Sequence, residues 1–386
     1  MRIALVSPYD WCVDGGVKSH ISHLAAYFRD WGHEVEIFAP ASEPDKVNRE
    51  CTVMGKPRSM RVSGSVARIT FAWKSPEVKE VLARGDFDVV HLHEPLMPLL
   101  PYHFLRYSTS TTIGTFHAAK DGGNRFYGYT TRLTRRWFRK LDGKIAVSPA
   151  AVSLVSRYFA GYFNIIPNGI DYAHFAQERE PLADFADGRK NILFVGRPEK
   201  RKGLKYLLRA YIRIKELEPN TRLIVVGAGD FSRYERLMAP IGDVVFRSYV
   251  PYDELPRYHR SASVFCAPNT GNESQGYVLL EAMAAGVPVV ASNIEGFAGV
   301  ITDQLDGILV PPKDSDALAL AVVHLLRNPA QRAELSSRGQ AQAAHYSWDN
   351  VARRVMSYYE RILYEHRQVA EATSRRPLVA PLSGPE

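Results

Sequence analysis

Residues 272–292 have the sequence NESQGYVLLEAMAAGVPVVAS, in which a helix is followed directly by a strand. Residues 277–285 are nearly all good helix formers, and Gly286 supplies a signal that ends a helix. The run from Val287 to Ala291 is short, apolar and rich in β-branched residues, so it predicts a buried strand. Helices that alternate with buried strands are typical of α/β folds with a parallel sheet.

The same stretch carries two acidic side chains in a regular relation to the helix. Glu273 comes just before the predicted helix start at Gly276, and Glu281 lies about one turn inside it. Eight residues of helix rise about 12 Å, which is about the reach from one end of a nucleotide diphosphosugar toward the other. The helix start offers free N–H groups and a positive dipole end to an anion. We interpret Glu281 as a ligand of two ribose hydroxyls and Glu273 as directed at a sugar; two solvated glutamates beside a core helix are the alternative.

Predicted strands and helices alternate along most of the chain, in two series of strands. The strands are expected at 3–6, 34–39, 88–93, 113–117 and 143–148, and again at 191–196, 222–227, 244–246, 263–267 and 287–291. A turn-rich hinge at 164–171 separates the two series. A chain of 386 residues suits two domains. We expect Rossmann-like domains at 1–168 and 172–350, a helix at about 352–368 and a disordered tail at 371–386.

Composition and charge narrow the classes of protein. The hydrophobic content of 46% and the charged content of 23% are ordinary for a soluble globular protein. The three cysteines are odd in number and far apart, which favours a reducing cytosol over a disulfide framework. Nothing approaches about 18 unbroken apolar residues, so no membrane span is predicted. The net charge of +8 indicates a negatively charged partner, such as a nucleotide, a nucleic acid or an anionic lipid surface.

The loop Gly196-Arg-Pro-Glu-Lys-Arg-Lys-Gly203 lies directly after a predicted strand and before a helix. Ligands of parallel sheets bind at this edge. Arg197 can bind phosphate oxygens with two hydrogen bonds and Lys202 adds a compact charge, so the loop suits a diphosphate. A solvated basic loop is the alternative.

Weaker candidates lie in the first half. The pair Gly15-Gly16 opens the first predicted helix and allows a ligand to approach the backbone closely, although Gly-Gly is also an ordinary loop. His117 ends a strand where it could face the cleft, although a lone histidine is usually structural. The acid pair Asp86 and Asp88 precedes its strand, so we interpret it as structural. No His or Cys cluster has metal-ligand spacing, and Gly227-Ala228-Gly229 lacks the third glycine of a dinucleotide fingerprint.

Two basic regions compete for contact with a membrane. Residues 51–76 contain Lys56, Arg58, Arg61, Arg68 and Lys74 and no acid. Between 131 and 141, helical spacing groups the basic residues Arg132, Arg135, Arg136, Arg139 and Lys140 on one side and Leu133, Trp137, Phe138 and Leu141 on the other. A basic amphipathic helix suits an anionic lipid surface; a core-packed helix with a solvated basic face is the alternative. No known nucleic-acid-binding module is present.

Together these motifs resemble the retaining GT-B glycosyltransferases over residues 1 to about 365. The resemblance rests on the Glu273-x7-Glu281 stretch, the loop 196–203, the hinge 166–171 and the Gly15-Gly16 loop. Within that group the chain looks most like the bacterial phosphatidylinositol α-mannosyltransferases, through SPY at 7–9, GGV at 15–17, GSVAR at 64–68, GDFDVVHLHEP at 85–95 and TFH at 115–117. Gln275 stands where that family usually has an aromatic residue, and Ala118-Ala119-Lys120 replaces a hydroxyl-rich run.

The resemblance implies two Rossmann-like domains that face a central cleft, which closes on the donor, with the last helix crossing back to the first domain. It implies GDP-mannose as donor, with Arg197 and Lys202 on the diphosphate, Glu273 on the mannose and Glu281 on the ribose. The other residues expected at the donor are Gly15, Gly16, Gly276, Tyr277 and Val278. Those expected near the acceptor are Tyr9, Arg68, His117 and Arg201. The residues expected to take part in catalysis are His117, Glu273, Arg197 and Lys202.

The resulting hypothesis is a retaining transfer of mannose from GDP-mannose to a phosphatidylinositol-type lipid, without metal or other cofactor, at the cytoplasmic face of the membrane. Positioning and charge stabilisation would supply most of the rate. Two alternatives stay open. One is a transferase that uses UDP-glucose or UDP-galactose and acts on diacylglycerol or another acceptor. The other is a non-catalytic protein that binds sugar nucleotides or anionic membranes.

Overall fold

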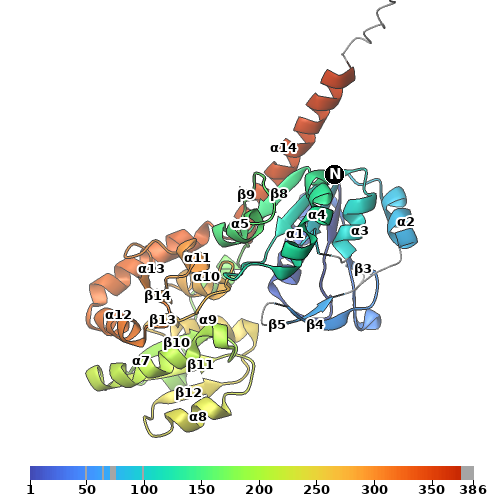
Figure 1. The fold of residues 1–386 in the computed structure, drawn as a ribbon. Coiled ribbons are helices and arrows are strands. Elements are labelled where there is room, and N and C mark those ends of the chain that lie inside the picture. Colours follow the sequence, from blue (N-terminus) through green and yellow to red (C-terminus); the bar gives the residue numbers. More distant parts are fainter. Residues whose placement is uncertain (48–49, 63–64, 70–74, 98–99, 375–386) are drawn as a thin grey trace, which may run out of the picture.

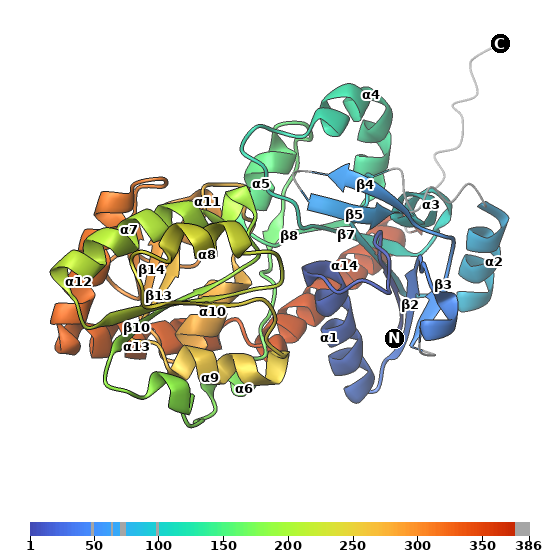
Figure 2. The same cartoon turned by 90° about the horizontal axis from the view of Figure 1, so that it is seen from below.

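The computed structural model describes residues 1–47, 50–62, 65–69, 75–97 and 100–374. The chain forms two lobes side by side, each built on its own sheet (Figures 1 and 2). The strand order is β3-β2-β1-β6-β7-β8-β9 in the first sheet and β12-β11-β10-β13-β14-β15 in the second. All neighbouring strands within these two sheets are parallel. The predicted α/β class with two Rossmann-like domains is confirmed.

The first domain holds the N-terminal sheet and its flanking helices. Its parallel strands are β1 (Arg2–Val6), β2 (Glu34–Ala39), β3 (Cys51–Val53), β6 (Val89–His93), β7 (Thr111–Phe116), β8 (Gly143–Ala146) and β9 (Asn164–Ile165). An antiparallel hairpin is formed by β4 (Arg58–Val62) and β5 (Ser65–Ile69). The helices are α1 (Gly16–Asp30), η1 (Pro44–Lys46), α2 (Ser75–Gly85), α3 (Leu100–Tyr107), α4 (Arg125–Lys140) and α5 (Pro149–Ser156).

The second domain repeats the plan. Its strands are β10 (Lys190–Val195), β11 (Thr221–Val226), β12 (Val244–Arg247), β13 (Val264–Ala267), β14 (Val289–Ser292) and β15 (Ile308–Val310). Its helices are α6 (Tyr172–Ala176), η2 (Ala183–Phe185), η3 (Lys200–Lys202), α7 (Leu204–Leu217), α8 (Ser232–Met238), η4 (Tyr252–Glu254), α9 (Leu255–Arg260), α10 (Tyr277–Ala284), α11 (Glu295–Ala298), α12 (Ser315–Arg327) and α13 (Pro329–Ala344).

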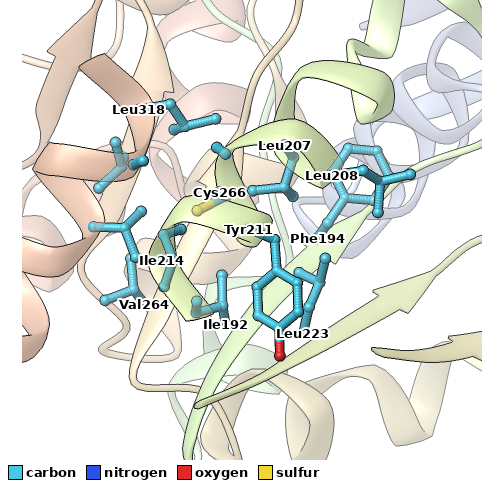
Figure 3. Close-up of a cluster of buried hydrophobic side chains, with 14 of the residues drawn as sticks. Ile192, Phe194, Leu207, Leu208, Tyr211, Ile214, Leu223, Val264, Cys266 and Leu318 are labelled. Atoms are coloured by element: carbon cyan, nitrogen blue, oxygen red, sulfur yellow. The ribbon is translucent and has the colours of Figure 1, made fainter. Parts of the chain in front are cut away.

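Successive side chains along each strand point to opposite faces of the sheet, so a core forms on each face of both sheets. In β10, Ile192 and Phe194 pack against α7 and α12 on one face, while Leu193 packs toward α10 on the other. Figure 3 shows the first of these cores, where Tyr211 and Cys266 lie among aliphatic side chains from β10, α7, β13 and α12. A strand buried on both faces reads as a continuous apolar run, which is why these strands could be predicted from the sequence.

The strand orders fix where a ligand can bind. The order reverses between β1 and β6 in the first sheet and between β10 and β13 in the second. Loops diverge at such a switch point and leave a crevice beyond the carboxyl ends of the strands. Asp88, by contrast, precedes β6 and accepts a hydrogen bond from the backbone N–H of Arg2 at 2.8 Å. This acid therefore fastens the opposite edge of the sheet.

The last helix, α14 (Trp348–Ser374), leaves the second domain and packs on the first. Figure 2 shows it running between the lobes, and its buried residues, such as Val355 and Tyr359, join the core that contains β1 and α1. The helix is longer at both ends than the predicted 352–368. Residues 371–374 of the predicted disordered tail are helical, and residues 375–386 lie outside the described residues. Cys12, Cys51 and Cys266 are free thiols.

Candidate active site

Two loops of the second domain meet at the carboxyl edge of its sheet. The loop 196–203 follows β10 and the loop 268–276 follows β13, which is its hydrogen-bonded neighbour. The backbone N–H of Thr270 donates to the carbonyl of Arg201 at 2.8 Å. Gly203 has a φ of +72°, and a Cβ there would lie 1.8 Å from the carbonyl oxygen of Pro268. The strand order thus brings the predicted phosphate loop against the predicted sugar-binding loop.

Glu273 lies at the centre of a charged network between these loops. Its Oε2 accepts from Lys202 Nζ at 2.6 Å, from Arg201 Nη1 at 3.1 Å and from Asn269 Nδ2 at 2.9 Å. The side chains of Lys202 and Glu273 are both 15% exposed, so water screens this pair weakly. Within the described part of the chain, no hydrogen bond engages the other oxygen, Oε1. Oε1 is therefore available to a sugar hydroxyl.

A second carboxylate, Glu199, holds the two arginines of the loop. Its Oε1 pairs with Arg197 Nη2 at 2.9 Å and its Oε2 with Arg201 Nε at 2.8 Å. The Arg197 side chain is 58% exposed, so its guanidinium can turn toward a phosphate at small cost. Arg201 was predicted to lie near the acceptor. It is bonded to two carboxylates of the second domain, Glu199 and Glu273, because loop 196–203 follows a strand of that domain; its contact with the acceptor stays a prediction.

Helix α10 begins where the sequence predicted, beside this network. Gly276 precedes it with a φ of +87°, and a Cβ there would lie 2.5 Å from the ring of Phe297. The first N–H groups of a helix, here from Tyr277 and Val278 onward, have no partner inside it and favour an anion. Gly286, with a φ of +72°, follows the end of the helix, as predicted.

A cavity of about 460 Å³ lies between the domains beside α10, a size typical of small-molecule sites. Four predicted donor residues, Gly15, Gly16, Tyr277 and Glu281, line it together with Ser19, His23, Gly169, Ile170, Asp171, Tyr252 and Trp348. Burial raises the pKa of Glu281 to about 7, and the charge of Lys202 opposes that rise. The Tyr277 hydroxyl donates to the Gly16 carbonyl across the domain boundary at 3.4 Å. The cavity therefore joins both halves of the predicted donor site.

His117 directly follows β7 and is held by two partners. Its Nε2 lies 2.8 Å from Nδ1 of His93, and its backbone N–H donates to Oε1 of Glu94 at 2.8 Å. Glu94, buried at a φ of +52°, also accepts from the backbone N–H of Ala118 at 2.9 Å. Burial lowers the pKa of His117 well below 6.5, so the ring is neutral at pH 7.

The remaining acceptor-side predictions have different outcomes. Tyr9 is half-buried; burial and the nearby Glu94 raise the pKa of its phenol, so it stays a neutral hydroxyl. The side chain of Arg68 lies outside the described residues, as do those of Arg58, Arg61 and Lys74 in the same basic region.

His117 belongs to a group of four histidines in the first domain. His20 of α1 lies 5.1 Å from His117 between ring centroids, and His91 lies 4.4 Å from His93. His91 is hydrogen-bonded through Nε2 to Thr115 at 2.6 Å and through Nδ1 to the hydroxyl of Tyr359 in α14 at 2.5 Å. Burial lowers the pKa of His20 to about 4 and of His91 to about 3. These rings are uncharged at neutral pH.

Helix α4 differs from its predicted amphipathic arrangement. Arg132, Arg135, Arg136 and Arg139 are exposed, and Phe138 and Leu141 are buried. Leu133, which helical spacing grouped with Phe138 and Leu141, is 75% exposed, near Tyr129 at 80%. The ammonium of Lys140 donates to the carbonyls of Arg106 and Ser108 at 3.0 and 2.9 Å, so it fastens the end of α3. The outer face of α4 thus mixes arginines with apolar side chains.

The sequence did not single out Asn269, Glu94, His93 or Asn168 as site residues, and it marked Gln275 only as a departure from the family pattern. Some carried a usable signal: His91 and His93 are two apart in a strand and therefore point to one face, and Glu94 ends that strand. Asn269 stands four residues before Glu273. The pair Asn168 and Gln275 is 107 residues apart and gives no local signal. Across the described ranges, no group of three His, Cys, Asp or Glu side chains is arranged to hold a metal ion.

Comparison with known proteins identifies the family. Residues 14–174 match the family model "Glycosyltransferase Family 4" and residues 177–342 match "Glycosyl transferases group 1". A protein named phosphatidyl-myo-inositol mannosyltransferase from Mycolicibacterium smegmatis is 37% identical over 369 residues, or 94% of each chain. The chain belongs to the GT-B glycosyltransferases. The protein is therefore an enzyme that transfers a hexose.

A second relative and two solved structures are also similar to this glycosyltransferase. A protein of the same name from Propionibacterium freudenreichii is 32% identical over 369 residues, covering 93% of this chain and 94% of that one. A glycosyltransferase from Rickettsia africae superposes with a TM-score of 0.73 at 18% identity, covering 94% of this chain and 98% of that one. HepE from Anabaena, solved with UDP, gives 0.73 at 16% identity, with 92% and 99% covered. The last two show the shared fold.

Proposed function

We propose that the enzyme transfers mannose, with retention of configuration, from GDP-mannose to a phosphatidylinositol-type lipid. The names of its relatives at 32–37% identity support the mannosyl donor and the lipid acceptor. The observation that carries the proposal is the meeting of Lys202, Arg201 and Glu273 between two loops, beside the cavity that contains Glu281. That geometry provides cations that suit a diphosphate. It also provides two carboxylates, Glu273 and Glu281, that can accept hydrogen bonds from sugar and ribose hydroxyls.

On the donor side, Arg197, Lys202 and the start of α10 bind the diphosphate. Glu281 accepts from the two ribose hydroxyls, and Oε1 of Glu273 accepts from a mannose hydroxyl. Glycosidic bond cleavage leaves negative charge on the diphosphate, which fixed cations in a partly buried site stabilise more strongly than water does. We expect the positive charge of these side chains to serve where other transferases use a metal ion. Chelation by EDTA should therefore leave turnover within twofold.

On the acceptor side, an inositol hydroxyl attacks C1 of mannose from the face that the diphosphate leaves. The new C1–O bond forms as the bond to the diphosphate breaks, and the hydroxyl proton passes to the departing phosphate oxygen. The neutral ring of His117 orients the acceptor, and Tyr9 and Arg68 bind the headgroup. The increase in reaction rate comes from holding the two reactants in the correct orientation.

We place the enzyme at the cytoplasmic face of the cell membrane as a peripheral protein. In the portion of the chain that the structure describes, no helix is long and apolar enough to cross a bilayer. The outer face of α4 combines Arg132, Arg135, Arg136 and Arg139 with the exposed Tyr129 and Leu133. Cations suit anionic headgroups, and the apolar side chains can enter the interfacial layer.

A donor panel tests the proposal. The enzyme is incubated with phosphatidylinositol vesicles and, in turn, GDP-mannose, GDP-glucose, UDP-glucose and UDP-galactose, and nucleotide release is followed. We expect rapid release from GDP-mannose alone, and a larger thermal shift with GDP than with UDP at equal concentration. Preference for a UDP-sugar would overturn the donor assignment. Vesicle binding with no donor consumed at all would overturn the proposed reaction.

A further inference from the structure

The segment 272–277, here called the donor loop, also forms the boundary between the two domains. Asn272 accepts from the backbone N–H of Asp121 at 3.3 Å, and Ser274 meets Ser148 at 3.4 Å between hydroxyl oxygens. Tyr277 bonds to Gly16, as described above. Glu273, within the same segment, points to the cations of the second domain. One short segment thus contacts the donor site and the first domain at once.

Gln275 makes the strongest of the contacts between this loop and the hinge. Its Oε1 accepts from the backbone N–H of Asn168 at 2.8 Å and from Asn168 Nδ2 at 3.1 Å, and its Nε2 donates to the Asn168 carbonyl at 2.9 Å. Gln275 is 3% exposed and Asn168 5% exposed. Buried polar groups lose much when a partner is removed, so this amide pair fixes the hinge relative to the donor loop.

Asn168 belongs to the hinge that connects the first domain to the second. A side-chain interaction with Asn168 raises the pKa of His20 and of His117 against the effect of burial. His117 itself is bonded to His93, and the segment that follows it contacts the donor loop, where the backbone N–H of Asp121 donates to Asn272. The donor loop is therefore held both to the hinge, through Gln275 and Asn168, and to the segment that follows His117.

We propose that Gln275 is a positioning residue for transfer to the acceptor: through Asn168 it fixes the hinge to the donor loop, and so sets the placement of the first domain, with His117, relative to that loop. This inference rests on the proposed function. Loss of the amide pair leaves the diphosphate and ribose contacts of the second domain in place but misplaces the acceptor. Water then competes better for C1 of the sugar. In that side reaction a water oxygen bonds to C1 as the diphosphate leaves, and the water proton passes to the diphosphate.

The test is the ratio of transfer to donor hydrolysis. Gln275→Met keeps the length of the side chain and removes its three hydrogen bonds; Gln275→Glu keeps the acceptor oxygen and removes the donor. With GDP-mannose and phosphatidylinositol vesicles, we expect Gln275→Met to lower the ratio at least tenfold, with the GDP dissociation constant within twofold of the wild type. Gln275→Glu should fall between the two, and Asn168→Ala combined with Gln275→Met should lower the ratio little beyond the single changes.

A matched control separates this role from general stability. Gln342 and Gln275 line the same cavity, and Gln342 donates to the Val300 carbonyl at 3.2 Å. Gln342→Met therefore removes a comparable glutamine from the same region and should leave the ratio of transfer to hydrolysis unchanged. An unchanged ratio in Gln275→Met, or losses of transfer, hydrolysis and GDP affinity in equal proportion, would overturn the inference. If the wild-type enzyme transfers nothing from GDP-mannose, the proposed function fails, and the inference falls with it.

Discussion

Glu273 and Glu281 have the same side chain in opposite surroundings. Three N–H donors meet one oxygen of Glu273, two of them from cations, and these contacts fix the position of the carboxylate. Glu281 lines the cavity, and burial raises its pKa to about 7. The positive charge of Lys202 favours its ionised form and opposes that rise. The two carboxylates are therefore suited to different tasks, one to a fixed contact with the sugar and one to a contact that forms with the nucleotide.

Replacing Glu273 by Gln tests its assigned contact with the sugar. The amide keeps the size of the side chain but removes the negative charge, which stabilises a transition state with a developing positive C1, and replaces one of the two acceptor oxygens by a donor. We expect kcat to fall about 100-fold or more, as for loss of one preorganised electrostatic contact, and GDP affinity to change less than threefold. Glu235→Gln, an exposed position on α8, is the control. Equal losses in turnover and GDP affinity would contradict the role.

The raised pKa of Glu281 predicts a pH-dependent nucleotide affinity. Ribose hydroxyls donate to a carboxylate, so binding favours the ionised form, which is scarce below pH 7. We expect GDP affinity to rise about tenfold per pH unit up to about pH 7 and then level off. Titration calorimetry between pH 5.5 and 8.5 measures this, including the proton released on binding. Glu281→Gln should flatten the profile; a flat profile in the wild type would refute the contact.

The sequence indicated that Glu273 and Glu281 belong to one site. It did not indicate which side chains bond to them or that burial raises the pKa of Glu281. Helical spacing and the position before a helix indicated Glu273 and Glu281. The environment of each carboxylate comes from strands and loops distant in sequence, such as Asn269 and Lys202 around Glu273. The ion pairs of Arg201 with Glu199 and Glu273 could not be predicted for the same reason, and its contact with the acceptor stays a prediction.

Helix α4 is the element whose surface is least explained by packing. Its arginines, Tyr129 and Leu133 are exposed, and Tyr129 and Leu133 are not among the described residues that form the core of the first domain. Asn124 caps the start of the helix by accepting from the backbone N–H of Phe126 at 2.9 Å. The inner face packs through Tyr127 and Phe138. The helix is therefore anchored on one side and can offer the other to a membrane.

Charge removal from α4 tests the membrane contact. Changing Arg132, Arg135 and Arg136 together to Gln should weaken binding to anionic vesicles by roughly 3 kcal/mol, about 100-fold, at about 1 kcal/mol per basic residue. Sedimentation with phosphatidylinositol vesicles measures it, and the difference should shrink in high salt. The control changes three exposed arginines of the second domain, Arg209, Arg233 and Arg236. Equal vesicle binding by both triple variants would contradict the assignment.

Among the elements, long apolar strands were predicted well and short ones were missed. The runs that became β1, β2 and β11 stood out because both faces of each strand are buried. β3, β9 and β15 are two or three residues long and gain their stability from a neighbouring strand. Leu133 shares a face with Phe138 in the helical spacing and is nevertheless exposed, because spacing divides a helix into faces but does not say how far the core extends around it.

At the scale of the whole molecule, buried neutral histidines make stability depend on pH. Burial lowers the pKa of His20 to about 4, and of His91 and His259 to about 3. Below the ordinary value of 6.5 the unfolded chain binds protons that the folded chain does not, so stability is full above pH 6.5 and falls as the pH drops. Each of the three contributes a loss of about 1.4 kcal/mol per pH unit.

Thermal unfolding at pH 7.5 and 5.5 measures this loss. His259 packs between Phe175 and Phe265, with neither ring nitrogen bonded in the described residues. His259→Phe should therefore unfold near the wild-type temperature at pH 7.5 and several degrees above it at pH 5.5. His324→Gln, at an exposed site, should follow the wild type. An equal acid shift in His259→Phe and the wild type would contradict this explanation.

The arrangement of the domains was predictable only in outline. Two strand series and a turn-rich hinge indicated two Rossmann-like domains, and chain order placed the binding loops at the carboxyl edges. The order of the strands determined which loops meet, because β10 pairs with β13 across 68 residues of intervening chain. The buried pair of Gln275 and Asn168 depends on how the domains sit together, so only the structure could show it.

The proposed reaction can be checked by identifying its lipid product. Wild-type enzyme and Glu273→Gln are incubated with GDP-mannose and phosphatidylinositol vesicles, and the lipid is analysed by mass spectrometry and by NMR of the anomeric proton. We expect one added hexose, α-linked to inositol, from the wild type and at most about one hundredth as much from the variant. Unmodified phosphatidylinositol, or a β-linked product, would contradict it.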